Sequence, residues 1–220
     1  MPQFIPIDTD RWSRKSYYDH FMSTVRCTFS MTVDLDITQL RSTCKDKGIK
    51  LYPALIYAIA AVVNQHQCFR MDIDADGNLG YWESLSPCYT VFNPQNEQFS
   101  NLSVPYSDSF APFYSSYLAN LQAYGQCEEL WPQPDIPYST FSVSAIPWAK
   151  FTAFNLNIYA EGEYLLPIFT MGKYAQQPDG SVLLPLALQV HHAVCDGYHA
   201  SKLTNDLQQQ LYRCDEWLQG

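Results

Sequence analysis

The sequence lacks the cysteine pattern of a disulfide-stapled or zinc-bound protein. Its seven cysteines are odd in number and scattered along the chain, and no two of them are spaced Cys-x-x-Cys. Small secreted domains pair their cysteines, and zinc ribbons use two Cys-x-x-Cys pairs. We therefore interpret all seven as reduced thiols.

Basic residues are few and dispersed. The 220 residues include 13 Lys and Arg against 22 Asp and Glu, which gives a formal net charge of −9, and the basic residues form no run. Nucleic acids and anionic membranes attract clustered positive charge. The composition argues against both as partners, and an anionic ligand would have to be bound by a few local side chains.

Long hydrophobic runs are absent as well. The longest run, Leu51–Val63, is shorter than the roughly 17 to 25 apolar residues that cross a bilayer. Near the start of the chain, Pro, Asp and Arg interrupt the segment where a secretory leader would need at least about seven apolar residues. We expect a cytoplasmic protein without a membrane span.

The sequence is rich in residues for a hydrophobic core. Hydrophobic residues make up 47% of the chain and aromatic residues 15%, and there is no internal repeat or long linker. Apolar residues at strand and helix spacing predict strands at 29–35, 80–93 (with a turn), 141–146, 151–160, 165–174 and 182–192, and helices at 36–48, 53–63, 111–124 and 198–218. We predict a single α/β domain, residues 1–220, built as a two-layer sandwich with helices packed on a mixed sheet.

The segment Asp72–Glu83 matches the pattern of a calcium-binding loop in full. Such a loop needs a helix on both sides, whereas Pro87 and the aromatic and β-branched residues around it favour a strand. We therefore expect a hairpin with Asp76 and Gly77 in its tight turn. A non-catalytic calcium-binding module remains an alternative.

The densest group of chemically active side chains is His191–His199, where a predicted buried strand ends and a helix begins. Successive side chains of a strand point to opposite faces, so only one of His191 and His192 can serve a given site. Three other interpretations stay open on the residues alone. The histidines could bond to backbone carbonyls, one of them could join Asp196 and His199 on zinc, or Cys195 could be a nucleophile. Because no second Cys or His cluster completes a zinc site, we predict no metal.

Several motifs occur together in this chain. Residues 191–197, HHAVCDG, fit the HHxxxDG motif of coenzyme A-dependent acyltransferases, and dihydrolipoyl acyltransferase cores carry a similar one. Further segments occur in the order of the trimeric chloramphenicol acetyltransferases: WSRK at 12–15, KLYP at 50–53, SAIPW at 144–148, FNLN at 154–157 and TMGKY at 170–174. Essentially from end to end, the chain resembles this family, the type without hexapeptide repeats.

The resemblance implies a set of catalytic residues. His192 matches the general base, and an imidazole with a pKa of about 6.5 suits proton removal from a hydroxyl at neutral pH. Ser144 matches the donor to the oxyanion of the tetrahedral intermediate, and Thr170 matches a hydroxyl that assists through water. Asp196 would suit a catalytic triad, but the resemblance implies that it pairs with Arg14 and maintains the shape of the site.

The resemblance also implies the ligands. Residues near the coenzyme A tunnel match Lys50, Lys173 and Tyr174, and residues of the acceptor pocket match Phe21, Cys27, Phe99 and Trp131. Phe21 stands where characterised relatives have a tyrosine, so one hydrogen bond to the acceptor is in question.

The implied reaction is acetyl-CoA-dependent O-acetylation of the primary hydroxyl of chloramphenicol, an antibiotic inactivation. The hydroxyl would attack the thioester directly, with acetyl-CoA as cosubstrate and no tightly bound cofactor. The sites would lie between the subunits of a homotrimer. A related acyltransferase with a different acceptor is the nearest alternative.

Overall fold

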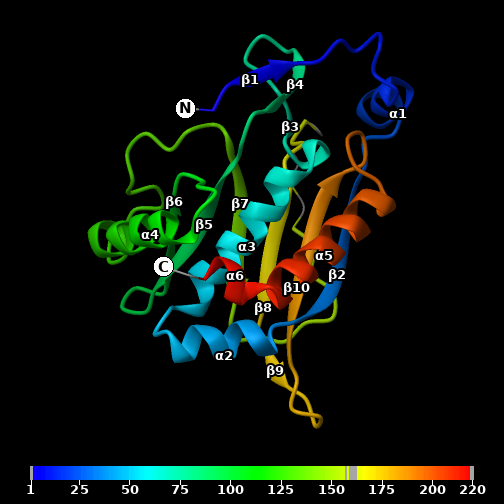
Figure 1. Ribbon diagram of the computed structural model, residues 1–220. Helices are drawn as coiled ribbons and strands as arrows, with labels where there is room; N and C mark the ends of the chain where they lie inside the picture. Colours follow the sequence, from blue (N-terminus) through cyan, green and yellow to red (C-terminus); the bar gives the residue numbers. More distant parts are fainter. Residues whose placement is uncertain (1, 157, 159–162, 219–220) are drawn as a thin grey trace.

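The chain is described by a computed structural model that covers residues 2–156, 158 and 163–218. Its main sheet has seven strands in the order β2-β10-β8-β7-β5-β6, with the short β9 paired to β10 (Figure 1). These strands are β2 Thr28–Asp36, β5 Ser86–Asn93, β6 Gln98–Ser103, β7 Thr140–Ile146, β8 Ile168–Gly172, β9 Ala175–Gln176 and β10 Val182–His191. Because β7 pairs in parallel with β5 and β8 while the other pairs are antiparallel, the sheet is mixed, as predicted.

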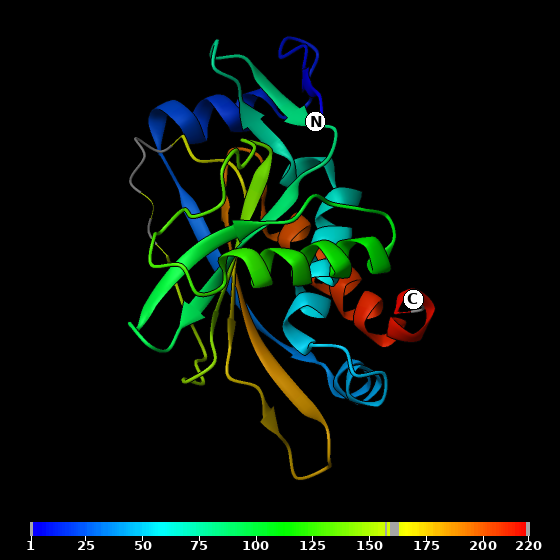
Figure 2. The same cartoon turned by 90° about the vertical axis from the view of Figure 1, so that its left-hand side faces the viewer.

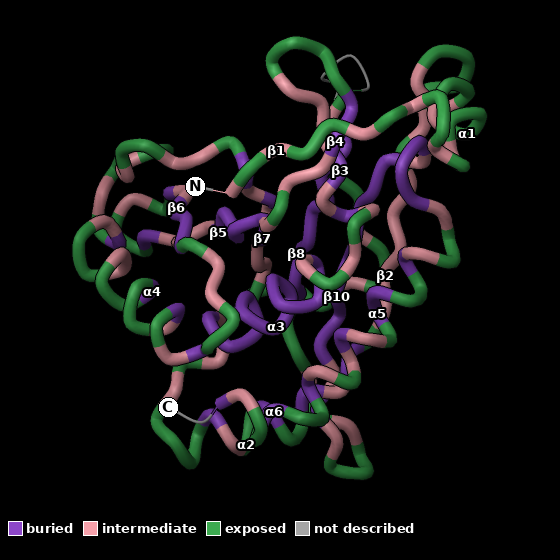
Figure 3. Tube along the Cα trace, turned by 45° about the horizontal axis from the view of Figure 1, so that its top comes forward, coloured by how far each residue is buried: buried purple, intermediate pink, exposed green. Residues whose placement is uncertain are grey.

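The larger helices cover one face of this sheet. They are α2 Thr38–Asp46, α3 Leu51–Gln65, α4 Phe110–Tyr124, α5 Gly197–Tyr212 and the short α6 Cys214–Trp217. Figure 2 shows α2, α3 and α5 together on one side of the strands, which confirms the expected layers. The apolar run that predicted a buried helix forms α3, whose residues Pro53–Val63 are all buried (Figure 3).

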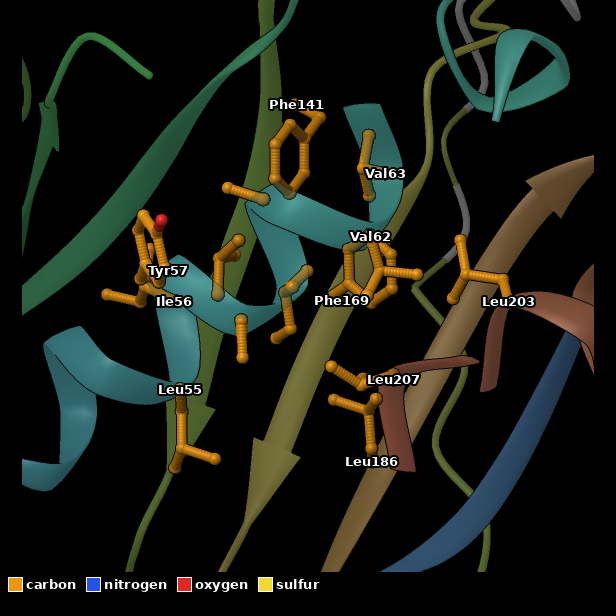
Figure 4. Packing of buried hydrophobic residues seen from close by; sticks show 14 of the residues in the cluster. Leu55, Ile56, Tyr57, Val62, Val63, Phe141, Phe169, Leu186, Leu203 and Leu207 are labelled. Carbon is orange, nitrogen blue, oxygen red and sulfur yellow. The ribbon is translucent and has the colours of Figure 1, made fainter. Parts of the chain in front are cut away.

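The register of the strands decides which side chains face the helices. Phe141, Phe169 and Leu186 extend from β7, β8 and β10 toward α3 and α5 in the core (Figure 4). Side chains alternate along a strand, so Ser144 on β7 and Thr170 on β8 belong to the opposite face. The two are register partners, and Thr170 in turn pairs with Ala187 on β10. A row of small and hydroxylated side chains therefore lies on the face away from the helices.

A smaller sheet joins the N-terminal segment to a hairpin. Its strands are β1 Phe4–Pro6, β4 Leu79–Trp82 and β3 Met71–Ile73. The hairpin predicted in place of a calcium loop is confirmed: β3 and β4 are antiparallel, and Gly77 in the turn has φ +83°, a value that favours glycine. The segment after Glu83 enters β5, so no exit helix follows. The remaining short helices are α1 Lys15–Asp19, η1 His20–Thr24 and η2 Gln67–Phe69.

The strand predicted for 151–160 is wrong over the residues that the structure describes. Residues 151–156 are irregular, while 157, 159 and 160 lie outside the described residues. Strands β7, β8 and β10 already have a neighbour on each side, so this segment finds no free edge there. The segment makes other contacts instead. The ring centroids of Phe151 and Phe154 are 5.5 Å apart, and the backbone N–H of Leu156 donates to Gln189 Oε1 at 3.1 Å.

Smaller differences concern the ends of elements. The strand predicted at 165–174 is shortened to β8, and the helix predicted at 198–218 is interrupted at Arg213 between α5 and α6. Strand β10 ends at His191, so His192 lies in the following turn. Across the described part of the chain, none of the helices has the length and apolar character needed to span a bilayer.

Candidate active site

His192 is held by two hydrogen bonds at the end of β10. Its backbone N–H donates to the carbonyl of Cys27 at 2.9 Å, and its Nδ1 lies 3.1 Å from the carbonyl oxygen of Cys195. A carbonyl oxygen only accepts, so Nδ1 must carry the proton in this bond. Nε2 of the neutral ring therefore keeps its lone pair, and it is the nitrogen that can take up a proton.

Aromatic rings fix the plane of this imidazole. The Phe21 ring stacks on His192 with centroids 4.0 Å apart and an angle of 8° between the planes. Phe29 meets the same imidazole edge-on at 5.3 Å. The structure thus places Phe21 and Cys27, two of the predicted acceptor-pocket residues, next to His192.

His191 has different surroundings. Only 1% of its surface is exposed, and its Nδ1 accepts from the Ala193 N–H at 3.2 Å. His192 is half-buried and borders the partly exposed side chain of Phe21. Of the two histidines, His192 is the one with access to a ligand.

Asp196 is bonded to two basic side chains. Its Oδ2 accepts from Arg14 Nη1 at 2.9 Å, and its Oδ1 lies 2.8 Å from His199 Nδ1. Burial by itself would raise the pKa of Asp196, but the hydrogen bonds from Arg14 and His199 outweigh burial and lower the pKa to about 2. Since His192 Nδ1 is bonded to the Cys195 carbonyl, Asp196 does not take the orienting place of a triad aspartate. We call His192, Phe21, Cys27, Arg14 and Asp196 the histidine cluster.

Ser144 and Thr170 form part of a second group on the opposite face of the sheet from the helices. Thr170 is buried, whereas Ser144 is partly exposed. The hydroxyl of Thr90, on β5, lies 3.2 Å from Ser144 Oγ. Thr170, Ser144 and Thr90 therefore lie on the neighbouring strands β8, β7 and β5. Ser144 occupies the middle strand and is partly exposed.

A cavity of about 380 Å³ is lined by residues of α3 and by residues at the ends of β7 and β8, and neither Ser144 nor Thr170 is among them. Its wall includes Thr90, Phe99 and Tyr174 as well as Ala145 and Met171, the residues that follow Ser144 and Thr170. The remaining lining is mostly apolar: Leu51, Tyr52, Leu55, Val91, Phe92, Tyr117, Pro147, Trp148, Gly172 and Leu184.

The predicted coenzyme A residues lie around this cavity. Lys50 directly precedes Leu51, and Lys173 lies between Gly172 and Tyr174, so both lysines border lining residues. We call Ser144, Thr170, Thr90, Phe99, Tyr174, Lys50 and Lys173 the serine cluster. Trp131 is not part of this wall; it lies in the Pro-rich segment after α4 and is 57% exposed.

The two clusters are well separated within one chain. Ser144 lies in one row with Thr170 and Ala187, and His192 is five residues farther along the chain than Ala187. At about 3.3 Å per residue these five steps span roughly 17 Å, and two strand spacings of about 4.8 Å add to the distance. Neither side chain is long enough to bridge it. One chain therefore does not bring His192 to Ser144.

Cys195, Asp196 and His199 have surroundings that differ from those of a nucleophile or of zinc ligands. Cys195 is 1% exposed, and burial raises the pKa of its thiol, so the reactive thiolate is disfavoured. Asp196 and His199 bond to each other, and within the part of the chain that the structure describes no three His, Cys, Asp or Glu side chains are grouped to bind a metal.

Two residues that line the cavity, Thr90 and Trp148, were given no role on the basis of the sequence. Thr90 carries no motif, because a threonine in a strand is common, and only strand pairing shows that it meets Ser144. Trp148 belongs to the quoted SAIPW motif but had no assigned role; its indole lies 4.7 Å from the Phe92 ring, centroid to centroid, at the cavity.

Known proteins resemble this chain both in sequence and in structure. A family model described as chloramphenicol acetyltransferase matches residues 2–208. A chloramphenicol acetyltransferase of Clostridium butyricum is 50% identical over 97% of both chains, and one of Clostridium perfringens is 49% identical over 98% of both. A solved chloramphenicol acetyltransferase superposes with a TM-score of 0.87 at 23% identity, over 96% of this chain and 100% of the other.

A solved dihydrolipoamide acetyltransferase of Azotobacter vinelandii has the same fold at lower similarity. Its TM-score is 0.68 at 19% identity, over 87% of this chain and 84% of the other. Similarity of this kind supports the fold and does not assign an acceptor. The family model and the near full-length identity of the sequence relatives are decisive: the chain belongs to the chloramphenicol acetyltransferase family, and it is an acyltransferase.

Proposed function

We propose that this protein transfers the acetyl group of acetyl-CoA to the primary hydroxyl of chloramphenicol and thereby inactivates the antibiotic. The observation that carries the proposal is the bond from His192 Nδ1 to the Cys195 carbonyl, which leaves Nε2 available as a base. The substrates come from the names of the relatives. Acetyl-CoA acts as a cosubstrate, and no tightly bound cofactor is needed.

His192 moves one proton in this mechanism. Nε2 takes the proton of the acceptor hydroxyl while the hydroxyl oxygen attacks the thioester carbonyl carbon. The tetrahedral intermediate then collapses: the carbon–sulfur bond breaks, and the coenzyme A thiolate leaves and takes the proton back from the His192 imidazolium. The acetyl group passes directly to the acceptor, so no acyl-enzyme forms.

The Ser144 hydroxyl stabilises the negative oxygen of that intermediate. Thr90 supports this role, because a Thr90 hydroxyl that donates to Ser144 Oγ leaves the Ser144 proton free to point at the oxyanion. Thr170, buried on the neighbouring strand, assists through a water molecule.

The cavity between α3 and the ends of β7 and β8 suits the long pantetheine arm of acetyl-CoA, because its lining is mostly apolar. It is linked to Ser144 through Thr90, which lines the cavity and lies 3.2 Å from Ser144 Oγ. Lys50, Lys173 and Tyr174 at its border are suited to the phosphate end of coenzyme A, where lysines act as point charges. On a chain with a net charge of −9, local cations of this kind are needed to hold an anionic cosubstrate.

The acceptor binds between the two clusters in this proposal. Phe21 and Cys27 contribute from the side of His192, and Phe99 and Trp131 contribute from the other side. Phe21 offers an aromatic face and no hydroxyl, so its contact with the acceptor is apolar.

The separation of the clusters supports a homotrimer with sites between subunits. His192 of one subunit would meet Ser144 of the next, which is the arrangement of a closed ring with head-to-tail interfaces. Large apolar side chains are exposed near both clusters, as expected of surfaces that another subunit covers: Val25 and Tyr198 near His192, and Trp148 near Ser144. Residues 1–220 would form one acyltransferase domain of that ring.

All seven cysteines are free thiols, which fits a reducing compartment, and we place the reaction in the cytoplasm.

The reaction is tested by following release of the coenzyme A thiol from acetyl-CoA. We expect release with chloramphenicol and none with chloramphenicol already acetylated on its primary hydroxyl. Dihydrolipoamide, with the product identified by mass spectrometry, tests the other acceptor class of this fold. Faster acetylation of dihydrolipoamide than of chloramphenicol would overturn the proposed acceptor.

Cys195→Ala is expected to keep kcat within about threefold of the wild type, because a buried thiol with a raised pKa serves packing and not catalysis. Steady-state kinetics measure kcat, and mass spectrometry of the enzyme with acetyl-CoA alone detects any acetyl adduct. An inactive variant, or an acetyl thioester trapped on Cys195 of the wild type, would contradict direct transfer.

A further inference from the structure

Both oxygens of the Asp196 carboxylate are held, each from a different part of the chain. Arg14, just before α1, donates to Oδ2 at 2.9 Å. On the other side, Oδ1 accepts from the Tyr198 N–H at 3.0 Å and lies 2.8 Å from His199 Nδ1. His199 stands in the first turn of α5, and Asp196 is the N-cap of that helix.

The geometry fixes where the His199 proton lies. A carboxylate oxygen only accepts, so a separation of 2.8 Å from Nδ1 requires a proton on Nδ1. The Asp196 N–H also faces His199 Nδ1, but at 3.4 Å, and it cannot donate to a nitrogen that already carries a proton. His199 therefore donates to Asp196 through Nδ1–H.

This bond acts on the residue that orients the base. The carbonyl that accepts from His192 Nδ1 belongs to Cys195, which is joined to Asp196 by a planar peptide unit. Turning that carbonyl away from His192 would rotate the adjoining N–H and displace Asp196. Because Arg14 and His199 hold the two carboxylate oxygens from different elements, such a rotation is opposed from both sides.

We propose that His199 is a positioning residue of the reaction: through Asp196 it holds the Cys195 carbonyl in place and so keeps His192 in the Nδ1–H tautomer. Without this bond the Cys195 carbonyl is less constrained, and part of the His192 population takes the Nε2–H tautomer. In that tautomer Nε2 carries a proton and cannot act as the base. The inference rests on the proposed role of His192.

His199→Leu is expected to lower kcat about 10-fold to 100-fold, by analogy with the losses caused by removing the partners that orient histidines in metal sites. Both KM values stay near those of the wild type, since His199 touches neither substrate in this account. His199→Asn is expected to restore kcat to within about threefold of the wild type, because its side-chain N–H₂ can donate to Asp196 Oδ1 from nearly the place of Nδ1.

The matched control is His66→Leu. His66 Nε2 lies 2.9 Å from Asp206 Oδ2, so this histidine also pairs with an aspartate, ten residues beyond Asp196 along the chain. We expect kcat of His66→Leu within about threefold of the wild type. If His66→Leu and His199→Leu lose kcat equally, the effect belongs to the anchoring of α5 and the positioning role is wrong.

The decisive measurement is the tautomer of the His192 ring, taken from the ¹⁵N NMR spectrum of ring-labelled histidines. The His192 signal is assigned by its loss in His192→Ala. We expect the Nδ1–H tautomer of His192 in the wild type and in His199→Asn, and a mixture with the Nε2–H tautomer in His199→Leu. Unchanged kcat and an unchanged His192 tautomer in His199→Leu would overturn the role of His199 and leave the proposed function standing. Full activity of His192→Ala would instead overturn the proposed function.

If His199→Leu does not fold, the wild-type spectrum still decides. A His199 ring without a proton on Nδ1 would contradict the bond to Asp196 on which the inference depends.

Discussion

His192→Ala is expected to lower kcat by about 10²- to 10⁴-fold, the usual contribution of a general base. The variant removes Nε2, the nitrogen that the bond to the Cys195 carbonyl leaves free to take a proton. Folding should survive, because His192 lies in the turn after β10 and is only half-buried. Steady-state kinetics with acetyl-CoA and chloramphenicol, with circular dichroism as a check on folding, measure the effect.

His191→Gln is the matched control for this prediction. His191 is buried and its Nδ1 accepts from the Ala193 N–H, a bond that the Gln side-chain oxygen can also accept. We expect most of the turnover to remain. A loss equal to that of His192→Ala would mean that the wrong histidine was chosen. If His192→Ala keeps an activity within a few-fold of the wild type, His192 is not the general base.

Ser144→Ala is expected to lower kcat by about 10²- to 10³-fold, as the loss of one oxyanion donor usually does. Both KM values should change little, because the hydroxyl bonds to the intermediate and not to the bound substrates. Ser142→Ala is the matched control, since Ser142 lies two residues earlier on the same face of β7. A rise in KM alone for Ser144→Ala would make Ser144 a binding residue.

Local patterns in the sequence predicted much of the fold. The alternation in β2, the fully apolar run of α3 and the Asp76-Gly77 turn each depend on neighbouring residues, and the structure has all three. The segment after β7 shows the limit of such patterns. Residues 151–156 have strand-like composition, but whether a strand forms depends on a free sheet edge, which is set by distant parts of the chain.

In the candidate site, too, the features that depend on neighbouring residues could be predicted, and those that depend on distant residues could not. The motif around His192 could be recognised from its residues, because a histidine at the end of a strand beside a helix start lies within a few positions of the sequence. The bond between Thr90 and Ser144 could not, because it joins residues 54 apart through the order of the strands. The separation of His192 from Ser144 within one chain, which the resemblance implied through sites between subunits, follows from the same strand order.

A mixed trimer tests the account most directly. His192→Ala and Ser144→Ala chains, each inactive alone, are unfolded, combined in equal amounts and refolded, and chloramphenicol acetylation is then assayed. If sites lie between subunits, random mixing places an intact His192 opposite an intact Ser144 at about one quarter of the interfaces. We therefore expect about a quarter of the wild-type activity to return. No recovery in mixed trimers confirmed by mass spectrometry, or a monomer in sedimentation of the wild type, would contradict a site shared between subunits.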